Sequence, residues 1–409
     1  MKKLTRLIIT VMLCVFTLSV VGCDKQEIKK DDDVVDSSRL YGVCYLGLEW
    51  EVETKDFSVY EKSFELMKNM GIKSCRNWMH ANWLLDSPTE INEENCEIMH
   101  RMLATAKKYD IQIIGMSHNW FTGTMSYMFV PQRDMSEGSY YVKWLLNYDK
   151  SWETLAKEFP EVTLWEIGNE LNNDDFIHPE TFNSDGLTYS LRQKSQIATD
   201  MLYYGSRGVK RGNPQAKTIM GGLSNGQGFY NGKDASFLNE LYLNIKSGDW
   251  PSTDPDKYFD YLAWHPYSLT SEPNDKWVEV NNELYAISQK YEQRNKKVYL
   301  TEFGYPSTIY KNNINGELDK NTDWILKAYS LIAEKMPYVE SMHCFRMFNS
   351  SKAYSWGNNI SLTSYGFFND PLYSDGDAKS IAIAFQKQAG GSGPLDLAYN
   401  SNPKPDPYR

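Results

Sequence analysis

The sequence lacks most of the patterns that mark metal, nucleotide and nucleic-acid sites. It has six histidines and six cysteines but no CxxC, HxH or HExxH pattern, so neither zinc nor another metal is expected. No GxGxxG motif follows the first predicted strand, which leaves dinucleotide binding without its usual support. The net charge is -10 and no dense basic run occurs, which argues against a nucleic-acid partner. We therefore expect no cofactor.

Cysteine is scarce beyond the N-terminal segment. Four cysteines remain there, widely spaced along the chain: Cys44, Cys75, Cys96 and Cys344. Buried free thiols are the first interpretation, because an unpaired cysteine behaves as a small apolar residue. A disulfide formed after export remains open.

The N-terminus has the pattern of an export signal. Lys2, Lys3 and Arg6 precede an apolar run over residues 7–21. The sequence Val-Val-Gly-Cys that ends at Cys23 resembles a bacterial lipobox, whose cysteine is lipidated and becomes the first residue of the mature chain. A membrane-spanning start is the alternative, but the run is shorter than the ~20 residues that a span usually requires.

This interpretation divides the chain into four parts. They are a signal peptide at residues 1–22, a lipidated Cys23 with a flexible tether at 23–38, a folded domain at 39–388, and an irregular tail at 389–409 that is rich in Gly, Pro and Asn. It places the domain at the bacterial cell envelope, facing the periplasm or the exterior. The lipid is then the only contact with the membrane.

Apolar runs alternate with amphipathic stretches along the predicted domain. Eight runs have the character of strands, at residues 41–47, 73–78, 111–118, 162–170, 218–224, 261–267, 298–304 and 341–348. Helix-like stretches follow them at residues 60–70, 94–109, 140–159, 191–211, 236–245, 278–294, 322–335 and 378–388. Eight such units predict parallel strands with crossover helices, and eight is the number that closes a (β/α)8 TIM barrel. An open doubly wound sheet is the alternative.

Two glutamates end separate predicted strands. Glu170 ends the run TLWEIGNE on the fourth strand, and Glu302 ends the run VYLTE on the seventh. In a barrel, catalytic groups lie at the C-terminal ends of strands, and these two strands face each other across the mouth. Two carboxyls that converge there suit glycoside hydrolysis, because one protonates the leaving oxygen while the other stabilises positive charge on the sugar carbon.

The motifs on successive strands resemble those of clan A retaining glycoside hydrolases, including cellulase-like and β-xylosidase-like families. They are Arg76 on the second predicted strand, His118-Asn119 on the third, Asn169-Glu170 on the fourth, His265-Pro266-Tyr267 on the sixth and Thr301-Glu302-Phe303-Gly304 on the seventh. The resemblance spans about residues 40–388. It implies a TIM barrel that cleaves β-glycosidic bonds.

The resemblance also implies roles for the matching residues. Glu170 corresponds to the general acid/base and Glu302 to the nucleophile. Asn169 corresponds to the residue that bonds the sugar 2-hydroxyl, a contact expected to strengthen in the transition state. Arg76 and Tyr267 correspond to groups that bond the nucleophile and keep it ionised.

Further residues are expected to line the sugar site. The resemblance places His118, Asn119 and His265 in the subsite of the cleaved sugar. Clan A enzymes commonly have a Trp at the end of the eighth strand, yet the sequence there reads MHCFRMFNS. Flat aromatic faces suit the C–H faces of sugar rings, and the candidates that could supply them are Trp50, Trp120, Phe345 and Trp356.

These observations together predict a monomeric retaining glycoside hydrolase with an oligo- or polysaccharide substrate. The charge of Glu302 is expected to raise the pKa of Glu170 and keep that acid protonated until the sugar esterifies Glu302. Two alternatives stay open: a carbohydrate-binding lipoprotein on a barrel that has lost catalysis, and a solute-binding lipoprotein of two lobes. The sugar and its linkage lie beyond the sequence.

Overall fold

The computed structural model describes residues 37–45, 58–118, 129–179, 188–225, 233–268, 272–306, 317–349, 365–369 and 378–395. The main sheet consists of β1 (Tyr41–Tyr45), β2 (Ser74–Trp78), β5 (Gln112–Ser117), β7 (Leu164–Ile167), β9 (Lys217–Met220), β10 (Leu223–Ser224), β11 (Leu262–His265), β12 (Val298–Phe303) and β13 (Val339–Cys344). Two-stranded ribbons form between β3 (Leu85–Ser87) and β4 (Glu90–Ile91), and between β6 (Phe129–Val130) and β8 (His178–Pro179).

The helices alternate with the main-sheet strands as predicted. They are α2 (Ser58–Met70), α3 (Ala81–Leu84), α4 (Glu93–Lys108), α5 (Tyr140–Glu158), α6 (Leu191–Gly212), α7 (Lys233–Ser247), α8 (Asp275–Tyr291), α9 (Glu317–Lys335) and α10 (Ser380–Gln388), with 3-10 turns η1 (Ser37–Leu40) and η2 (Pro255–Lys257). Only the short α3, the 3-10 turns and the two ribbons have no counterpart among the predicted elements of the described chain.

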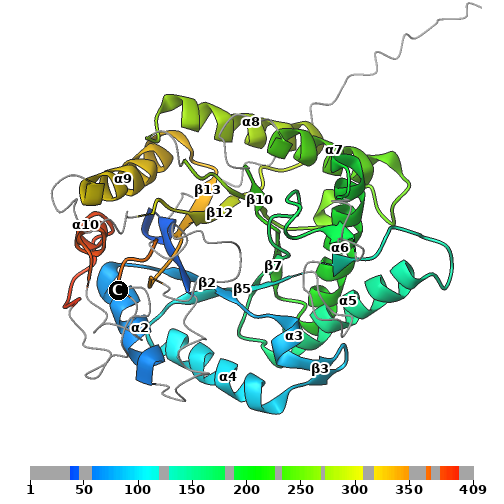
Figure 1. Ribbon diagram of the computed structural model, residues 1–409, viewed down its shortest axis with the longest axis horizontal. Helices are drawn as coiled ribbons and strands as arrows, with labels where there is room; N and C mark the ends of the chain where they lie inside the picture. Colours follow the sequence, from blue (N-terminus) through cyan, green and yellow to red (C-terminus); the bar gives the residue numbers. More distant parts are fainter. Residues whose placement is uncertain are drawn as a thin grey trace, which may run out of the picture.

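All neighbouring strands of the main sheet run parallel, in the order β10-β11-β12-β13-β1-β2-β5-β7-β9. Neighbouring strands in this order are successive main-sheet strands of the chain, except that β13, the last strand, lies beside β1, the first. A doubly wound sheet would reverse at a switch point, so that alternative does not describe this chain. The fold is mixed α/β, with a curled nine-stranded parallel sheet that helices surround (Figure 1).

The two end strands of this order, β9 and β10, are consecutive in the chain. Gly221 and Gly222 separate them. A parallel bridge pairs Ile219 of β9 with Tyr261, the residue before β11. A Cβ atom at Gly222 would lie 2.3 Å from Nε2 of His265, so a glycine is required for the chain to pass this side chain so closely.

Side-chain caps begin several of the helices. Ser190 accepts a hydrogen bond from the backbone N–H of Gln193, whose side chain accepts from the backbone N–H of Ser190, and this capping box begins α6. Ser139 accepts from the backbone N–H of Val142 at 3.1 Å and begins α5. Such caps supply partners for the N–H groups that the first helical turn leaves unsatisfied.

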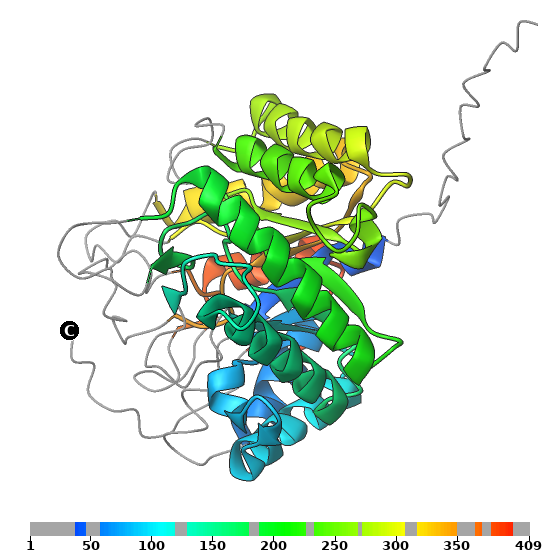
Figure 2. The same cartoon turned by 90° about the vertical axis from the view of Figure 1, so that its right-hand side faces the viewer.

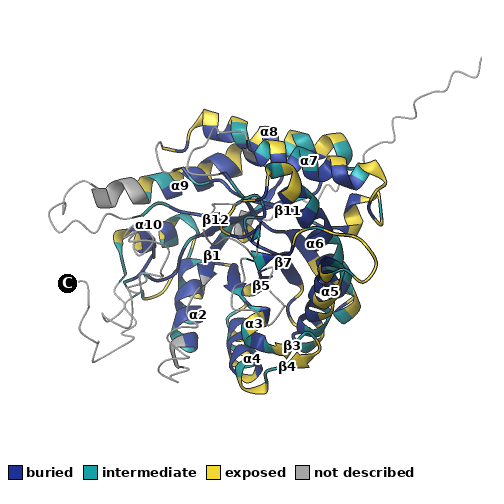
Figure 3. Ribbon diagram, turned by 45° about the vertical axis from the view of Figure 1, so that its right-hand side comes forward, coloured by how far each residue is buried: buried dark blue, intermediate teal, exposed yellow. Residues whose placement is uncertain are grey.

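The core lies between the sheet and the surrounding helices. Strands β7 and β11 are buried along their whole length, as expected for parallel strands that are covered on both faces. The helices are buried on the faces toward the sheet and exposed on the outer faces (Figure 3). The long helices α5 and α6 pack side by side along one flank (Figure 2).

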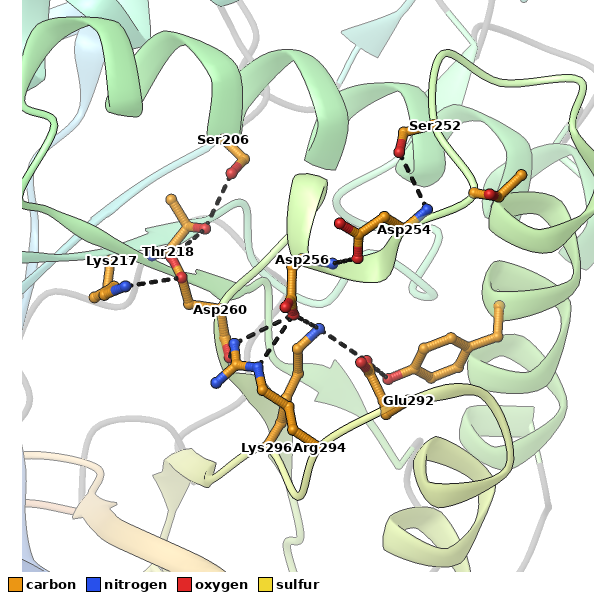
Figure 4. Close-up of polar contacts among 12 residues, drawn as sticks. Ser206, Lys217, Thr218, Ser252, Asp254, Asp256, Asp260, Glu292, Arg294 and Lys296 are labelled. Atoms are coloured by element: carbon orange, nitrogen blue, oxygen red, sulfur yellow. Dashed lines mark hydrogen bonds and ion pairs between the residues drawn. The ribbon is translucent and has the colours of Figure 1, made fainter. Parts of the chain in front are cut away.

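A polar network joins the N-terminal ends of β9, β11 and β12 (Figure 4). Lys296 is fully buried, and its Nζ lies 2.9 Å from a carboxylate oxygen of Asp256 and 2.9 Å from one of Glu292. The phenol of Tyr242 donates to the same Glu292 oxygen at 2.6 Å. Asp260 accepts from the backbone N–H of Thr218 at 2.8 Å. The network thereby ties the loop before β11 to the bottom of the sheet.

Replacing Lys296 by methionine is expected to lower the free energy of unfolding by about 3 kcal/mol, because Glu292 would stay buried without its cation. Urea denaturation followed by circular dichroism measures the change. The matched control is Lys276→Met, since Lys276 pairs with Glu279 on the surface, with side chains 54% and 61% exposed. Its expected cost is less than about 0.5 kcal/mol. Equal effects of the two substitutions would contradict the structural role of Lys296.

Some predicted features fall outside the described residues: the signal peptide, Cys23, most of the tether, and residues 396–409 of the tail. Within the described chain, no helix combines the length and the apolar character that crossing a membrane requires. The thiols of Cys44, Cys75, Cys96 and Cys344 are all buried, and none forms a disulfide there. This agrees with the first interpretation of the cysteines.

Candidate active site

The two predicted carboxylates meet at the C-terminal ends of main-sheet strands. Glu170 lies three residues after β7, and Glu302 is the penultimate residue of β12. A carboxylate oxygen of Glu170 lies within 4.8 Å of one of Glu302. The expected convergence of these two side chains is therefore present.

The turn that presents Glu170 has an unusual backbone. Glu170 has a φ of 43°, in the left-handed region that residues other than glycine seldom adopt. Its N–H donates to the carbonyl of Gly222 at 2.8 Å, and its carbonyl accepts from the N–H of Asn173 at 2.7 Å. Backbone strain of this kind persists where surrounding contacts enforce it, and it concentrates at functional sites.

Arg76 of β2 lies fully buried at the centre of the site. Its Nη1 donates to Oε1 of Glu302 and its Nη2 to Oδ1 of Asn169, each at 2.6 Å, and its Nε donates to Oε2 of Glu166 at 2.5 Å. Burial lowers the pKa of Arg76, but the charges of Glu166 and Glu302 outweigh it and hold that pKa above its ordinary value. Because Asn169 uses its amide oxygen for Arg76, its amide nitrogen is left to donate elsewhere.

Glu302 accepts a hydrogen bond at each of its oxygens. Arg76 donates to Oε1, and the phenol of Tyr267 donates to Oε2 at 2.9 Å. Burial, and next the charge of Glu302, raises the pKa of Tyr267 well above its ordinary value. Tyr267 therefore keeps its proton as a donor. The two donors fix the orientation of the Glu302 carboxylate, whose side chain is only 9% exposed.

Glu170 is paired with a histidine. Nδ1 of His265 lies 3.0 Å from Oε1 of Glu170, and Nδ2 of Asn173 donates to Oε2 at 2.8 Å. Burial raises the pKa of Glu170, but the hydrogen bond and the charge of His265 contribute most to a net lowering. The expectation of a raised pKa for Glu170 is therefore wrong in its net direction for the free protein, because the imidazole of His265 is in direct contact with Glu170.

Glu170, His265 and Glu302 form the one group of three possible metal ligands among the described residues. Each already has protein partners, since Glu302 accepts from Arg76 and His265 lies 3.0 Å from the hydroxyl of Thr301. A metal ion bound there would lie close to the guanidinium of Arg76, and the two positive charges would repel each other. This donor set does not fit a cation site.

His118, which follows β5, belongs to an aromatic wall that interacts electrostatically with Arg76. Its ring stacks on His80 with 4.7 Å between centroids and on Phe176 with 5.3 Å, and it meets Trp78 edge-on at 5.2 Å. Burial, and next the charge of Arg76, lowers the pKa of His80 to about 4. Burial, and next the charge of His80, holds the pKa of His118 well below its ordinary value. Both imidazoles are neutral at neutral pH.

Stability is expected to fall as the pH drops below neutrality. The pKa of His80 is lowered to about 4 and that of His343 to about 3, in each case first by burial and then by Arg76. Histidines of the unfolded chain have a pKa of about 6.5. Below that pH these side chains bind protons in the unfolded state but stay neutral in the folded state, which favours unfolding. We expect urea denaturation to give a free energy of unfolding at pH 4.5 that is lower by about 2 kcal/mol or more than at pH 7.

The variant His343→Gln should reduce this dependence on pH. His343 is fully buried in β13, where its Nε2 lies 2.9 Å from the hydroxyl of Ser74. His100→Gln is the matched control, because the His100 side chain is 41% exposed beside Glu158. An equal slope in wild type and His343→Gln would contradict the neutral, buried state of His343.

Phe345 follows β13 and is half-buried. Its ring meets that of Tyr365 edge-on at 5.7 Å, and Tyr365 meets Tyr267 edge-on at 6.2 Å. Burial, and next the charge of Glu302, raises the pKa of Tyr365. Ring contacts thus connect Phe345 through Tyr365 to Tyr267, which donates to Glu302. Sequence analysis did not single out Tyr365. The other predicted aromatics and the predicted amide lie outside the described residues: Trp50, Asn119, Trp120 and Trp356.

Sequence analysis gave no role to Glu166 or to Thr301 of the seventh-strand motif, and both lie within strands. Glu166 is fully buried, and its Oε1 accepts from the N–H of Gly222 and from the hydroxyl of Thr301, each at 2.9 Å. A signal was present in the sequence, because a glutamate inside the apolar run LWEI needs internal hydrogen-bond donors. The sequence did not indicate which donors they are.

Comparisons by sequence return nothing: no family model and no curated protein matches this chain. Solved structures do match. A family 39 glycoside hydrolase from the gut symbiont Bacteroides cellulosilyticus superimposes with a TM-score of 0.59 at 18% identity, over 87% of this chain and 64% of that one. This chain therefore spans less than two thirds of the length of that protein.

Two further structures belong to other glycoside hydrolase families. A GH5_18 variant from Bifidobacterium longum subsp. longum, in complex with Manβ1-4GlcNAc, has a TM-score of 0.57 at 13% identity, over 90% of this chain and 80% of that one. A family 1 β-glucosidase from Thermotoga maritima has a TM-score of 0.57 at 12% identity, over 87% and 98%. At such identities these likenesses show a shared fold.

Proposed function

We propose that this chain is a retaining glycoside hydrolase that cleaves β-glycosidic bonds of an oligo- or polysaccharide. Glu170 acts as general acid/base and Glu302 as nucleophile. The observation that carries the proposal is the approach of their oxygens to within 4.8 Å. Retaining enzymes hold their two carboxyl groups about 5–5.5 Å apart, whereas inverting enzymes separate them by about 6.5–9.5 Å. The fold shared with glycoside hydrolases supports the proposal.

In the first step, Glu302 attacks the anomeric carbon of the sugar. The bond from that carbon to the leaving oxygen breaks, and the oxygen keeps the electron pair and takes a proton from Glu170. Arg76 and Tyr267 hold the attacking carboxylate through hydrogen bonds to its two oxygens. The amide nitrogen of Asn169 is offered to the sugar 2-hydroxyl, where a stronger contact in the transition state lowers the barrier.

In the second step, water releases the sugar. Glu170, now a carboxylate, takes a proton from water while the water oxygen bonds to the anomeric carbon. The bond between that carbon and Glu302 breaks, and its electron pair returns to the carboxylate, which again faces Arg76. Two displacements at one carbon give a product with the configuration of the substrate.

A sugar without charge is the proposed substrate class. The wall of His80 and His118 is neutral at neutral pH, so it offers hydrogen bonds and no ionic partner for an acidic sugar. Phe345, half-buried beside Tyr365, is proposed as the aromatic platform in place of the missing eighth-strand Trp. The disaccharide bound to the GH5_18 variant supports binding of a β-linked carbohydrate by this fold.

The finer fold and the location of the protein are also proposals. We propose that β9 and β10 are halves of one strand, so that the sheet is an eight-stranded barrel, and the bridge between Ile219 and Tyr261 supports this. The sequence pattern alone supports a signal peptide at residues 1–22, a lipid on Cys23 and a single catalytic domain at 39–388. A domain tethered to the cell envelope would follow, and we propose that it is a monomer.

A glycan screen tests the proposed function. The purified protein would be incubated with β-linked oligo- and polysaccharides of plant and host origin, and new reducing ends would be quantified. We expect turnover of at least one substrate. Binding to glycans without any turnover across the panel would contradict the enzyme and identify a carbohydrate-binding protein instead.

A further inference from the structure

A chain of hydrogen bonds links the buried carboxylate of Glu166 to Glu170. The hydroxyl of Thr301 donates to Oε1 of Glu166 at 2.9 Å, and its oxygen lies 3.0 Å from Nε2 of His265. Nδ1 of the same imidazole lies 3.0 Å from Oε1 of Glu170. Glu166 and Thr301 are fully buried, so neither is placed to touch a substrate.

The chain has a fixed direction. A hydroxyl has a single proton, and Thr301 gives it to Glu166, so its oxygen accepts in the contact with His265. Nε2 of His265 must therefore carry a hydrogen. A neutral imidazole carries only one, so its Nδ1 then presents a lone pair to Glu170.

The contact between His265 and Glu170 consequently needs a proton of its own. A bare lone pair on Nδ1 would repel a carboxylate oxygen at 3.0 Å. One proton between them gives either a neutral acid beside a neutral imidazole, or a carboxylate beside an imidazolium, and both forms hold the same number of protons. The lowered pKa of Glu170 fits the second form in the free protein. The pair still holds the proton that a leaving group needs.

We propose that Thr301 and Glu166 are positioning residues that fix the tautomer of His265 and so retain the catalytic proton on the pair of Glu170 and His265. This inference rests on the proposed function. Without the hydroxyl, His265 is free to place its hydrogen on Nδ1 and to donate to the Glu170 carboxylate. That contact is stable with this one hydrogen alone. The second proton, which the leaving group needs, therefore dissociates from the pair of Glu170 and His265 at a lower pH.

The titratable groups that surround the pair and its hydrogen-bond partners stay in place when Thr301 is replaced. They are Arg76 of β2, Glu166 of β7, Asp175 in the turn after β7, Glu302 of β12, Tyr267 after β11 and the Cys44 thiol of β1. A change caused by Thr301→Val is therefore attributable to the lost hydroxyl. Thr301→Ser keeps the hydroxyl and is the matched control.

The first measurement is the 15N NMR spectrum of the histidine side chains in the wild type at neutral pH. The chain has six histidines, and comparison with His265→Gln assigns the signals of His265. We expect Nε2 of His265 to carry a hydrogen in the wild type and in Thr301→Ser. A neutral His265 with its hydrogen on Nδ1 in the wild type would overturn the inference, whether or not the protein hydrolyses glycosides.

The second measurement is the pH profile of kcat/KM on the substrate that the glycan screen identifies. We expect the alkaline limb of Thr301→Val to move by about one unit toward lower pH, and that of Thr301→Ser to stay near the wild type. The loss should shrink on a 2,4-dinitrophenyl glycoside of the same sugar, because this leaving group departs without a proton. An unshifted alkaline limb in folded Thr301→Val would overturn the inference while leaving the proposed function intact.

Discussion

Glu302→Ala is expected to lower kcat/KM by about 10⁴-fold or more, because no other group can form the bond to the anomeric carbon. The fold should survive, since Arg76 keeps its hydrogen bonds to Glu166 and Asn169. Initial rates on the substrate from the glycan screen measure the loss. Added azide should restore turnover and yield the α-glycosyl azide, because the anion attacks from the vacated side of the sugar in a single displacement.

Glu340→Ala is the matched control for this loss. Glu340 lies at the start of β13, where it pairs with Arg39 at 3.7 Å, at the end of the sheet away from the candidate site. Its removal should change kcat/KM by less than about twofold, as a surface pair contributes little. Retention of wild-type rates by Glu302→Ala would remove Glu302 from the mechanism.

Glu170→Ala is expected to lower kcat/KM by about 10²- to 10⁴-fold on substrates with poor leaving groups, because no acid remains to protonate the leaving oxygen. A 2,4-dinitrophenyl glycoside should still form the glycosyl enzyme rapidly, and hydrolysis of that intermediate should then limit turnover. Azide should accelerate this step and give the β-glycosyl azide. The alkaline limb of the pH profile should disappear.

Asp175→Asn is the matched control for Glu170→Ala, because it removes a nearby negative charge without removing the proposed acid. Asp175 lies in the same turn as Glu170, and the two carboxylates interact electrostatically. We expect kcat/KM of this variant within about threefold of wild type. A Glu170→Ala enzyme that treats good and poor leaving groups alike would contradict the acid role.

The arrangement of strands and helices was largely predictable because the hydrophobic period is a local property. The run that becomes β7 is apolar apart from Glu166, and the stretch that becomes α6 repeats its apolar residues with helical spacing. The break between β9 and β10 was not predictable. At this break the side chain of His265 lies close against Gly222, and the N–H of Gly222 donates to Glu166. These contacts join segments that are distant in the sequence.

The convergence of Glu170 and Glu302 could be predicted because a carboxylate at the end of an apolar strand is costly to hold beside a core without a functional reason. Glu170 and Glu302 carry that signal by their position alone. Glu166 and Thr301 lie inside strands, where their partners come from across the sheet. The direction of the Glu170 pKa shift also depends on such contacts, because it is set by the imidazole of His265 at 3.0 Å.

The stereochemistry of the first product tests the central claim most directly. Proton NMR during the first minutes of hydrolysis, before mutarotation, identifies the anomer that the enzyme releases from a β-linked substrate. Because Glu170 and Glu302 lie close enough for direct attack by Glu302, we predict that the β-anomer forms first and the α-anomer appears only by later equilibration. Release of the α-anomer first would mean a single displacement by water and would contradict Glu302 as the nucleophile.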